Sequence, residues 1–122
     1  MALKKIVAVD DSGIILKMLE KVLSPKYEFR AFSEGTRALK FLEKKTVDLI
    51  ILDIDMPEMD GFELLNIIRL ENHLKNVPVI FLTSNGDKNH VIKAITSGAN
   101  DYAVKPIDED VLLEKINVLL SD

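Results

Sequence analysis

Short runs of apolar residues without a polar break recur along the chain and predict strands that are buried on both faces. Three such runs, each four residues long and rich in isoleucine, leucine and valine, cover residues 6–9, 49–52 and 79–82. Runs of this length are typical of the central strands of a parallel sheet. Pro57 cannot donate to a sheet ladder, so the strand that reaches Asp53 must end before it.

Two further segments predict strands at the margins of the sheet. Tyr27, Phe29 and Ala31 alternate with charged residues, which indicates a strand exposed on one side or lying at an edge. Residues 102–104 form a short fifth strand, which suits the opposite edge.

Apolar residues at helical spacing predict a helix after each strand. Pro25 ends the first helix, Gly98 stops the fourth, and Asp108 caps the fifth. The predicted apolar faces consist of Ile14, Ile15, Met18, Leu19 and Val22; Ala38, Leu39 and Leu42; Phe62, Leu64, Leu65 and Ile68; Val91, Ile92 and Ile95; and Leu112, Leu113, Ile116, Leu119 and Leu120.

This alternation of five strands and five helices predicts an α/β fold with a doubly wound parallel sheet. Right-handed crossovers restrict the possible topologies, and the strand order 2-1-3-4-5 places both marginal strands at edges. The order reverses between strands 1 and 3, and open sheets of this kind bind their ligands at that point.

Composition narrows the function classes. The chain has 122 residues, which suggests one domain over residues 1–122, and its net charge of −4 does not favour binding to nucleic acid or to an anionic membrane. It has no cysteine, and its first apolar run is too short for a signal peptide or a membrane span. We therefore expect a cytoplasmic protein that binds neither nucleic acid nor a membrane.

Five polar side chains are predicted to meet at one edge of the sheet. Asp10 and Asp11 follow strand 1, Asp53 ends strand 3, Thr83 ends strand 4 and Lys105 follows strand 5. The ordinary alternatives are a helix cap for Asp11 or Ser12, a turn position for Asp53, a local turn bond for Thr83 and a solvated surface position for Lys105. Their joint position at the edge where such folds bind ligands favours a functional site.

The chemistry of these groups indicates phosphoryl transfer. Clustered carboxylates raise one another's pKa unless a cation lies among them, and Mg²⁺ is the natural choice for oxygen ligands. Beside a lysine and a hydroxyl, the cluster suits a phosphoryl group, and a carboxylate nucleophile can form an aspartyl-phosphate. The chain has no G-x-x-x-x-G-K-[ST] or G-x-G-x-x-G motif, so nucleotide binding lacks support.

The chain resembles the response-regulator receiver domains of two-component signalling, of the CheY-like type with a flavodoxin-like fold. The resemblance covers the whole chain, and its specificity lies in the order and spacing of short motifs. These are Val9-Asp10-Asp11, Asp53 with Met56–Gly61, Thr83-Ser84, Gly98–Tyr102 and Lys105-Pro106.

The resemblance implies that Asp53 accepts a phosphoryl group from a histidine kinase or phosphotransfer protein. It also implies that Asp11 and Asp53 bind Mg²⁺ directly, Asp10 mainly through water, and Asp55 through its backbone carbonyl. Such a protein is a phosphoacceptor and not an enzyme, apart from slow loss of its own phosphoryl group.

The resemblance also implies how the phosphoryl group is held and how its presence is signalled. Thr83 and Lys105 hold the phosphoryl oxygens, the bond between Lys105 and Pro106 is cis, and Thr83 and Tyr102 act as a switch. Tyr102 is otherwise an ordinary aromatic of an edge strand. The surface of the fourth helix, fifth strand and fifth helix would signal to an unidentified downstream protein or output domain.

The sequence departs from the family pattern at positions that leave two properties open. Asp55 and Asn85 occupy variable positions that influence the lifetime of the phosphoryl group, so that lifetime is not predicted. Ile107 stands where many DNA-binding members have phenylalanine, and an arginine of their dimerisation face is missing, which argues against that dimer.

Three other protein classes share parts of this pattern. A phosphatase of the haloacid-dehalogenase type also has a D-x-D motif like Asp53-Ile54-Asp55, although that motif usually follows the first strand. An interaction module that never takes phosphate would not need the complete site. A flavin-binding domain needs a loop rich in serine, threonine and glycine where this chain has Asp10–Gly13. Whether the chain is a stand-alone regulator or part of a longer protein is left open.

Overall fold

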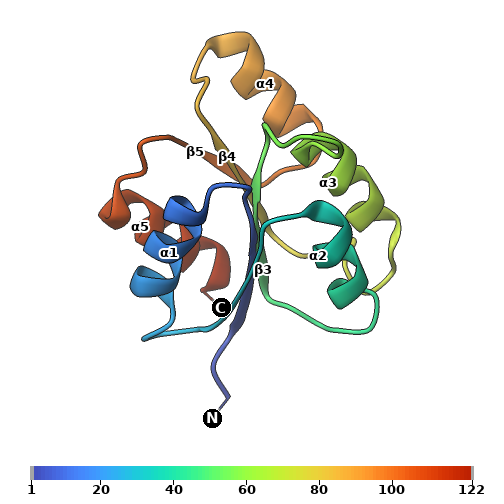
Figure 1. Ribbon diagram of the computed structural model, residues 1–122, viewed down its shortest axis with the longest axis vertical. Coiled ribbons are helices and arrows are strands. Elements are labelled where there is room, and N and C mark those ends of the chain that lie inside the picture. Colours follow the sequence, from blue (N-terminus) through green and yellow to red (C-terminus); the bar gives the residue numbers. More distant parts are fainter. Residues whose placement is uncertain (1, 122) are drawn as a thin grey trace.

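A five-stranded parallel sheet runs through the centre of the molecule in the computed structural model (Figure 1), which describes residues 2–121. The ends of the expected domain, Met1 and Asp122, lie outside the described residues. The sheet order is β2-β1-β3-β4-β5, which confirms the predicted 2-1-3-4-5 topology. The strands are β1 (Lys5–Val9), β2 (Glu28–Phe32), β3 (Leu49–Asp53), β4 (Val79–Thr83) and β5 (Asp101–Val104).

Helices cover both faces of the sheet. In Figure 1, α1 and α5 lie on one side of the strands, and α2 and α3 lie on the other. The helices are α1 (Gly13–Leu23), α2 (Gly35–Leu42), α3 (Gly61–Leu70), α4 (Lys88–Thr96) and α5 (Glu109–Leu120). No helix among residues 2–121 has the length and apolar character needed to cross a membrane.

The central strands divide their side chains between two cores. Val7 and Ile50 belong to the core beneath α2 and α3, whereas Ile6 and Ile51 belong to the core beneath α1 and α5. Every residue of β3 and β4 is buried, which explains why their apolar runs are uninterrupted. β2 is exposed at several positions, as expected for an edge strand, and begins at Glu28.

The predicted helix boundaries at Gly98 and Asp108 are confirmed. Gly98 follows α4 with φ +110°, a conformation that glycine adopts without a steric penalty. The Asp108 carboxylate accepts a hydrogen bond from the backbone N–H of Val111, so it caps α5.

Two predicted apolar faces need correction. Ile14 is 82% exposed, because at 3.6 residues per turn it points about 140° away from Leu19, the buried centre of α1. On α4 the buried residue is Ala94, and Ile92 lies about 160° from it around the helix. Ile92 is 48% exposed, and Ile95, which lies about 100° from Ala94, is 44% exposed.

Candidate functional site

The carboxyl ends of the parallel strands meet at one edge of the sheet, and polar residues occupy four of them. Asp10 directly follows β1, Asp53 is the last residue of β3, and Thr83 is the last residue of β4. Lys105 directly follows β5, and its backbone N–H donates to the Thr83 carbonyl at 2.7 Å. The structure therefore places these residues at the edge of the sheet at which the sequence predicted them.

Lys105 connects two of the carboxylates. Its Nζ lies 3.0 Å from Asp10 Oδ2 and 3.3 Å from Asp53 Oδ1, and its side chain is only 19% exposed. Burial lowers the pKa of Lys105, but the neighbouring carboxylates of Asp10 and Asp53 raise it by more than burial lowers it, so the net shift is upward. Lys105 is thus a charged member of the site and not a solvated surface lysine.

Asp53 is buried at the end of the central strand, and its environment opposes ionisation. Burial, followed by the charge of Asp10, raises the pKa of Asp53 from 3.8 to about 7. Lys105 and the backbone N–H of Asp55, which donates to Asp53 Oδ1 at 3.2 Å, act in the opposite direction.

Asp10 is fully buried, and only one of its oxygens has a well-formed hydrogen bond. Oδ1 accepts from the backbone N–H of Ser12 at 2.8 Å. Oδ2 has no hydrogen bond of good geometry among the described residues, although it faces the Lys105 ammonium. A buried carboxylate oxygen in this state can accept a further positive or hydrogen-bonding partner.

The carboxylates of Asp10, Asp11 and Asp53 form a group that fits a hard divalent cation. One oxygen from each lies within 4.8 Å of the others, and Asp11 is exposed, so one side of the group faces water. An all-oxygen donor set with access for water is what Mg²⁺ requires. The Asp55 carboxylate lies outside this group; the sequence-based expectation concerned its backbone carbonyl.

Thr83 is buried and makes a local turn. Its hydroxyl donates to the Asn85 carbonyl at 3.2 Å and accepts from the Asn85 N–H at 3.0 Å. This is the local bond that the sequence offered as the ordinary role of Thr83. The same hydroxyl lies at the carboxyl end of β4, so the local bond and a role at the site are compatible.

Tyr102 and Thr83 lie on one face of the sheet. Tyr102 is paired in register with Phe81, two residues before Thr83, and residues two apart on a strand share a face. The Tyr102 ring is partly buried against the core beneath α2 and α3, and the Lys115 ammonium lies 5.4 Å from its centroid. The Lys105–Pro106 peptide bond that follows β5 is cis, the isomer expected for it.

Gly61 is a residue whose importance the sequence did not show. A Cβ at this position would lie 2.6 Å from the backbone oxygen of Asp53 and 2.9 Å from Cα of Ile54. Any larger residue would displace the end of β3, which carries the central carboxylate. In the sequence, Gly61 stands out only as the last residue of the Met56–Gly61 motif, because a glycine in sequence does not show which backbone approaches it.

Comparisons with known proteins agree with this arrangement. The family model described as "Response regulator receiver domain" matches residues 6–117. The two-component response regulator ARR12 of Arabidopsis thaliana is 42% identical over 106 residues, and the autoinducer sensor kinase/phosphatase CqsS of Vibrio cholerae is 36% identical over 115. These matches cover 84% and 93% of the chain but only 17% of each relative's length.

Solved structures show the same fold. The chemotaxis protein CheY4 of Vibrio cholerae is 32% identical with a TM-score of 0.92, and the match covers 98% of this chain and all of that one. The receiver domain of the sensor histidine kinase PA1611 of Pseudomonas aeruginosa, described with a magnesium ion in its active-site cleft, is 26% identical. Its TM-score is 0.89, and the match covers 99% of this chain and all of that one. With its sheet order, its acidic group and the matched family model, the chain belongs to the response regulator receiver domains of two-component systems.

Proposed function

We propose that this domain receives a phosphoryl group on Asp53 from a histidine kinase or phosphotransfer protein and signals the change to a partner. One observation carries the proposal: Asp53 is a buried carboxylate that ends the central strand and shares the Lys105 ammonium with Asp10. A positioned carboxylate next to a fixed cation is suited to attack phosphorus.

In the proposed step, an Asp53 oxygen attacks the phosphorus of a donor phosphohistidine. A bond forms between this oxygen and phosphorus, which makes Asp53 an acyl phosphate. The nitrogen–phosphorus bond of the donor breaks, and its electron pair remains on the donor imidazole. Lys105 stays protonated, because its pKa is raised, and can neutralise a phosphoryl oxygen. Mg²⁺ held by Asp10, Asp11 and Asp53, with the Asp55 carbonyl as a further ligand, would supply charge neutralisation at the phosphoryl oxygens when bound.

The raised pKa of Asp53 supports this use of cations. A carboxylate attacks only when ionised, and burial beside Asp10 favours the protonated form. Positive charge at the site favours the ionised form again. The site is therefore arranged so that Asp53 becomes an effective nucleophile when Mg²⁺ neutralises the acidic group.

The proposed switch begins with the Thr83 hydroxyl. A phosphoryl oxygen on Asp53 would be a stronger acceptor for this hydroxyl than the Asn85 carbonyl that it now contacts. Movement of Thr83 would leave space on the face of the sheet that Tyr102 shares, and packed interiors do not tolerate voids. Tyr102 would then turn inward and change the surface formed by α4, β5 and α5.

The assignment of Asp53 is tested with a small phosphodonor and Mg²⁺. Mass spectrometry should show one added phosphoryl group on the parent protein and none on Asp53→Asn, because an amide is not a nucleophile in this reaction. Asp110→Asn, an exposed acid in the first turn of α5, is the matched control and should label like the parent. Labelling of Asp53→Asn at the parental level would assign the acceptor elsewhere, and repeated turnover of a phosphate ester would favour a phosphatase.

A further inference from the structure

A small cavity lies at the opposite end of the sheet from Asp53. It has a volume of about 110 Å³ and opens where β1 and β2 begin, beneath Phe41 of α2 and the segment that leads from α2 to β3. Lys5 lines this cavity, and Asp10 follows the other end of the same strand. At 3.3 Å per residue the two positions are about 16 Å apart, so the cavity is separate from the acidic group.

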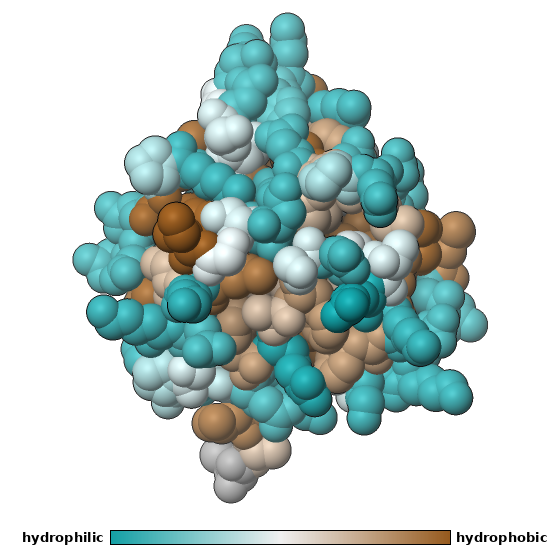
Figure 2. Space-filling model, viewed as in Figure 1, coloured by the Kyte–Doolittle hydropathy of each residue, from teal (hydrophilic) through white to brown (hydrophobic). Residues whose placement is uncertain are grey.

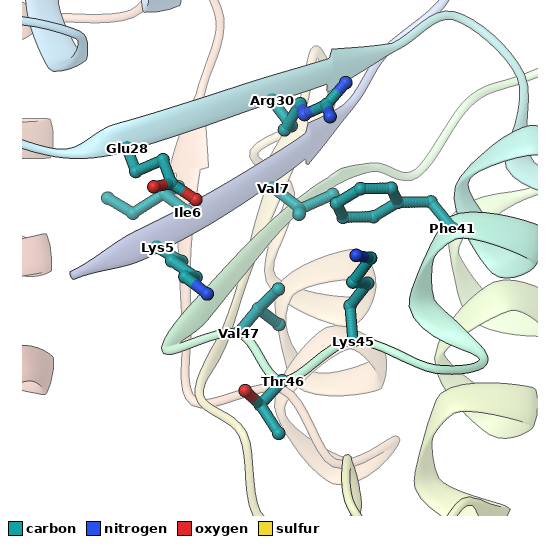
Figure 3. A pocket seen from close by; sticks show the side chains of 9 residues that line it. All are labelled: Lys5, Ile6, Val7, Glu28, Arg30, Phe41, Lys45, Thr46 and Val47. Atoms are coloured by element: carbon teal, nitrogen blue, oxygen red, sulfur yellow. The ribbon is translucent and has the colours of Figure 1, made fainter. Parts of the chain in front are cut away.

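Cations surround the cavity, although the whole chain is acidic. Lys5, Arg30 and Lys45 line it, against one acid, Glu28. Figure 3 shows the ammonium groups of Lys5 and Lys45 on opposite sides of Val47. Within residues 2–121, neither ammonium has a carboxylate within 4.0 Å. Glu28 pairs in register with Lys5, so the four charged side chains of the lining together carry a net charge of +2, which creates a positive potential in the cavity.

One wall of the cavity is both apolar and fixed in position. The Arg30 guanidinium lies 5.0 Å from the centroid of the Phe41 ring, and that ring packs against Phe32 at 5.3 Å. Val7 and Val47, which are buried, complete the apolar lining. Cation–π contact holds Arg30 without using its N–H donors, so these remain available to an acceptor.

We propose that this cavity binds a carboxylate carried on a short aliphatic stem. The lysine ammonium groups and Arg30 would neutralise the carboxylate, and the valines and Phe41 would cover the methylene groups. The volume limits the ligand to a few heavy atoms, because a cavity of about 150 Å³ holds a benzene molecule. A drug-sized ligand or nucleotide needs about 300 Å³ or more. A free short-chain acid and the side chain of a glutamate in a partner polypeptide both have this chemistry.

Amide NMR titrations with butyrate and with glutamate blocked at both ends test the proposal directly. Both acids should shift the amide resonances of Val7, Thr46 and Val47. The dissociation constants should be millimolar, and 1 mM corresponds to a binding free energy of roughly −4 kcal/mol. Butyramide and blocked glutamine, which keep the stem and lose the charge, should bind at least several-fold more weakly. Equal shifts with the neutral amides, or none with either acid, would overturn the proposal.

Three variants test which charged side chains bind the acids, because one should weaken binding, one should strengthen it and one should leave it unchanged. Lys45→Gln should weaken binding of both acids about two- to fivefold, the effect of one partly solvated charge pair. Glu28→Gln should strengthen it, because it removes the negative charge that competes with the ligand. Lys44→Gln is the matched control, since Lys44 is exposed and does not line the cavity. The affinity of this variant for both acids should equal that of the parent. An equal loss with Lys44→Gln would show general attraction to a basic surface and would overturn a specific site.

Further titrations separate the ligand classes. Tighter binding of blocked glutamate than of butyrate would identify a protein side chain as the source, whereas equal or weaker binding would identify a free acid. Inorganic phosphate, which has no apolar stem, should bind more weakly than either. Tighter binding of phosphate would overturn the assignment to an aliphatic carboxylate. Because Asp53 lies at the far edge, labelling of Asp53 should be unaffected by Lys45→Gln, so this result is independent of the proposed phosphoacceptor function.

Discussion

At Asp53, burial and the negative charge of Asp10 oppose ionisation of the carboxyl, whereas the Lys105 ammonium favours it. In the unfolded chain only the ordinary acidity of aspartate remains. The proton that Asp53 releases on unfolding is therefore a measurable property of the folded site.

Without Mg²⁺, the free energy of unfolding should fall as pH rises from about 4 to about 7. Across this range folded Asp53, with its pKa raised to about 7, holds a proton that the unfolded chain has lost. The folded state then binds more protons, so stability decreases with rising pH, by a few kcal/mol at most. Urea unfolding in a chelating buffer measures this slope. For Asp53→Asn, the free energy of unfolding should change less with pH over this range than it does for the parent. Parallel curves for the two proteins would contradict the raised pKa.

Asp11 differs from the other two carboxylates because it is exposed, so its removal leaves the core intact. Asp11→Ala should weaken Mg²⁺ binding by about tenfold or more, since one ligand of the oxygen set is lost. The metal-free variant should be at least as stable as the parent, because like charges at the site repel. Calorimetric titration and thermal unfolding measure the two effects, with Asp110→Ala as control. Unchanged Mg²⁺ affinity would remove Asp11 from the ligand set.

At the scale of elements, the proposed switch would run through the two strands β4 and β5, from the site to the surface formed by α4, β5 and α5. Register places Thr83, Phe81 and Tyr102 on one face, and α4 covers the same region with only Ala94 fully buried. Phe81 is fully buried and its ring packs against Phe62 at 5.2 Å, so the register neighbour of Tyr102 is held in place. A discrete two-state change is more consistent with such packing than a gradual deformation.

Thr83→Ala should separate phosphorylation from signalling. The variant should still label at Asp53, because the nucleophile and Lys105 are untouched, but should lose most of the change around Tyr102. A phosphoryl group shifts the equilibrium only through contacts that differ between the two states, and the hydroxyl supplies one of them. Amide chemical shifts of β5 and α4, with and without a phosphoryl mimic, provide the measurement.

The control for this experiment is Ser84→Ala, which removes a hydroxyl from the neighbouring exposed residue. It should respond like the parent. If Thr83→Ala responded as fully as Ser84→Ala, the hydroxyl of Thr83 would not connect the site to the surface.

At the scale of the whole molecule, the features that the sequence predicts are those that depend on the periodicity of apolar residues, namely the strands and their order. Uninterrupted runs in β1, β3 and β4 identify the central strands, and the ends of parallel strands necessarily share an edge, so Asp10, Asp53 and Lys105 could be placed together. The contacts that depend on packing were not predictable. The approach of Gly61 to the Asp53 backbone requires the tertiary structure. The basic cavity combines residues from two strands and a loop that no motif connects.

The exposed apolar surface near the site could not be predicted from periodicity, which places Ile14 on the buried face of α1. Figure 2 shows hydrophobic surface over the beginning of α1, where Ile14 is 82% exposed. It lies three residues after Asp11, in the first turn of the helix that starts beside the acidic group. A phosphorylated protein that reaches Asp53 must approach this edge, whereas a small phosphodonor needs no such contact. We therefore expect Ile14 to contact the protein donor.

Ile14→Ser should slow phosphoryl transfer from a phosphorylated histidine phosphotransfer protein, by up to about tenfold if the contact is worth about 1.5 kcal/mol. Labelling by a small phosphodonor should stay at the parental rate, because Asp53, Lys105 and the acidic group are unchanged. Leu70→Ser is the matched control: Leu70 is 83% exposed but ends α3, about 14 Å along that helix from Gly61, which contacts the Asp53 backbone. Equal slowing by both variants would indicate a general effect of surface hydrophobicity, and slowing with the small donor would indicate a disturbed site. If phosphoryl transfer is slowed only in Ile14→Ser and only with the protein donor, the donor docks on the first turn of α1.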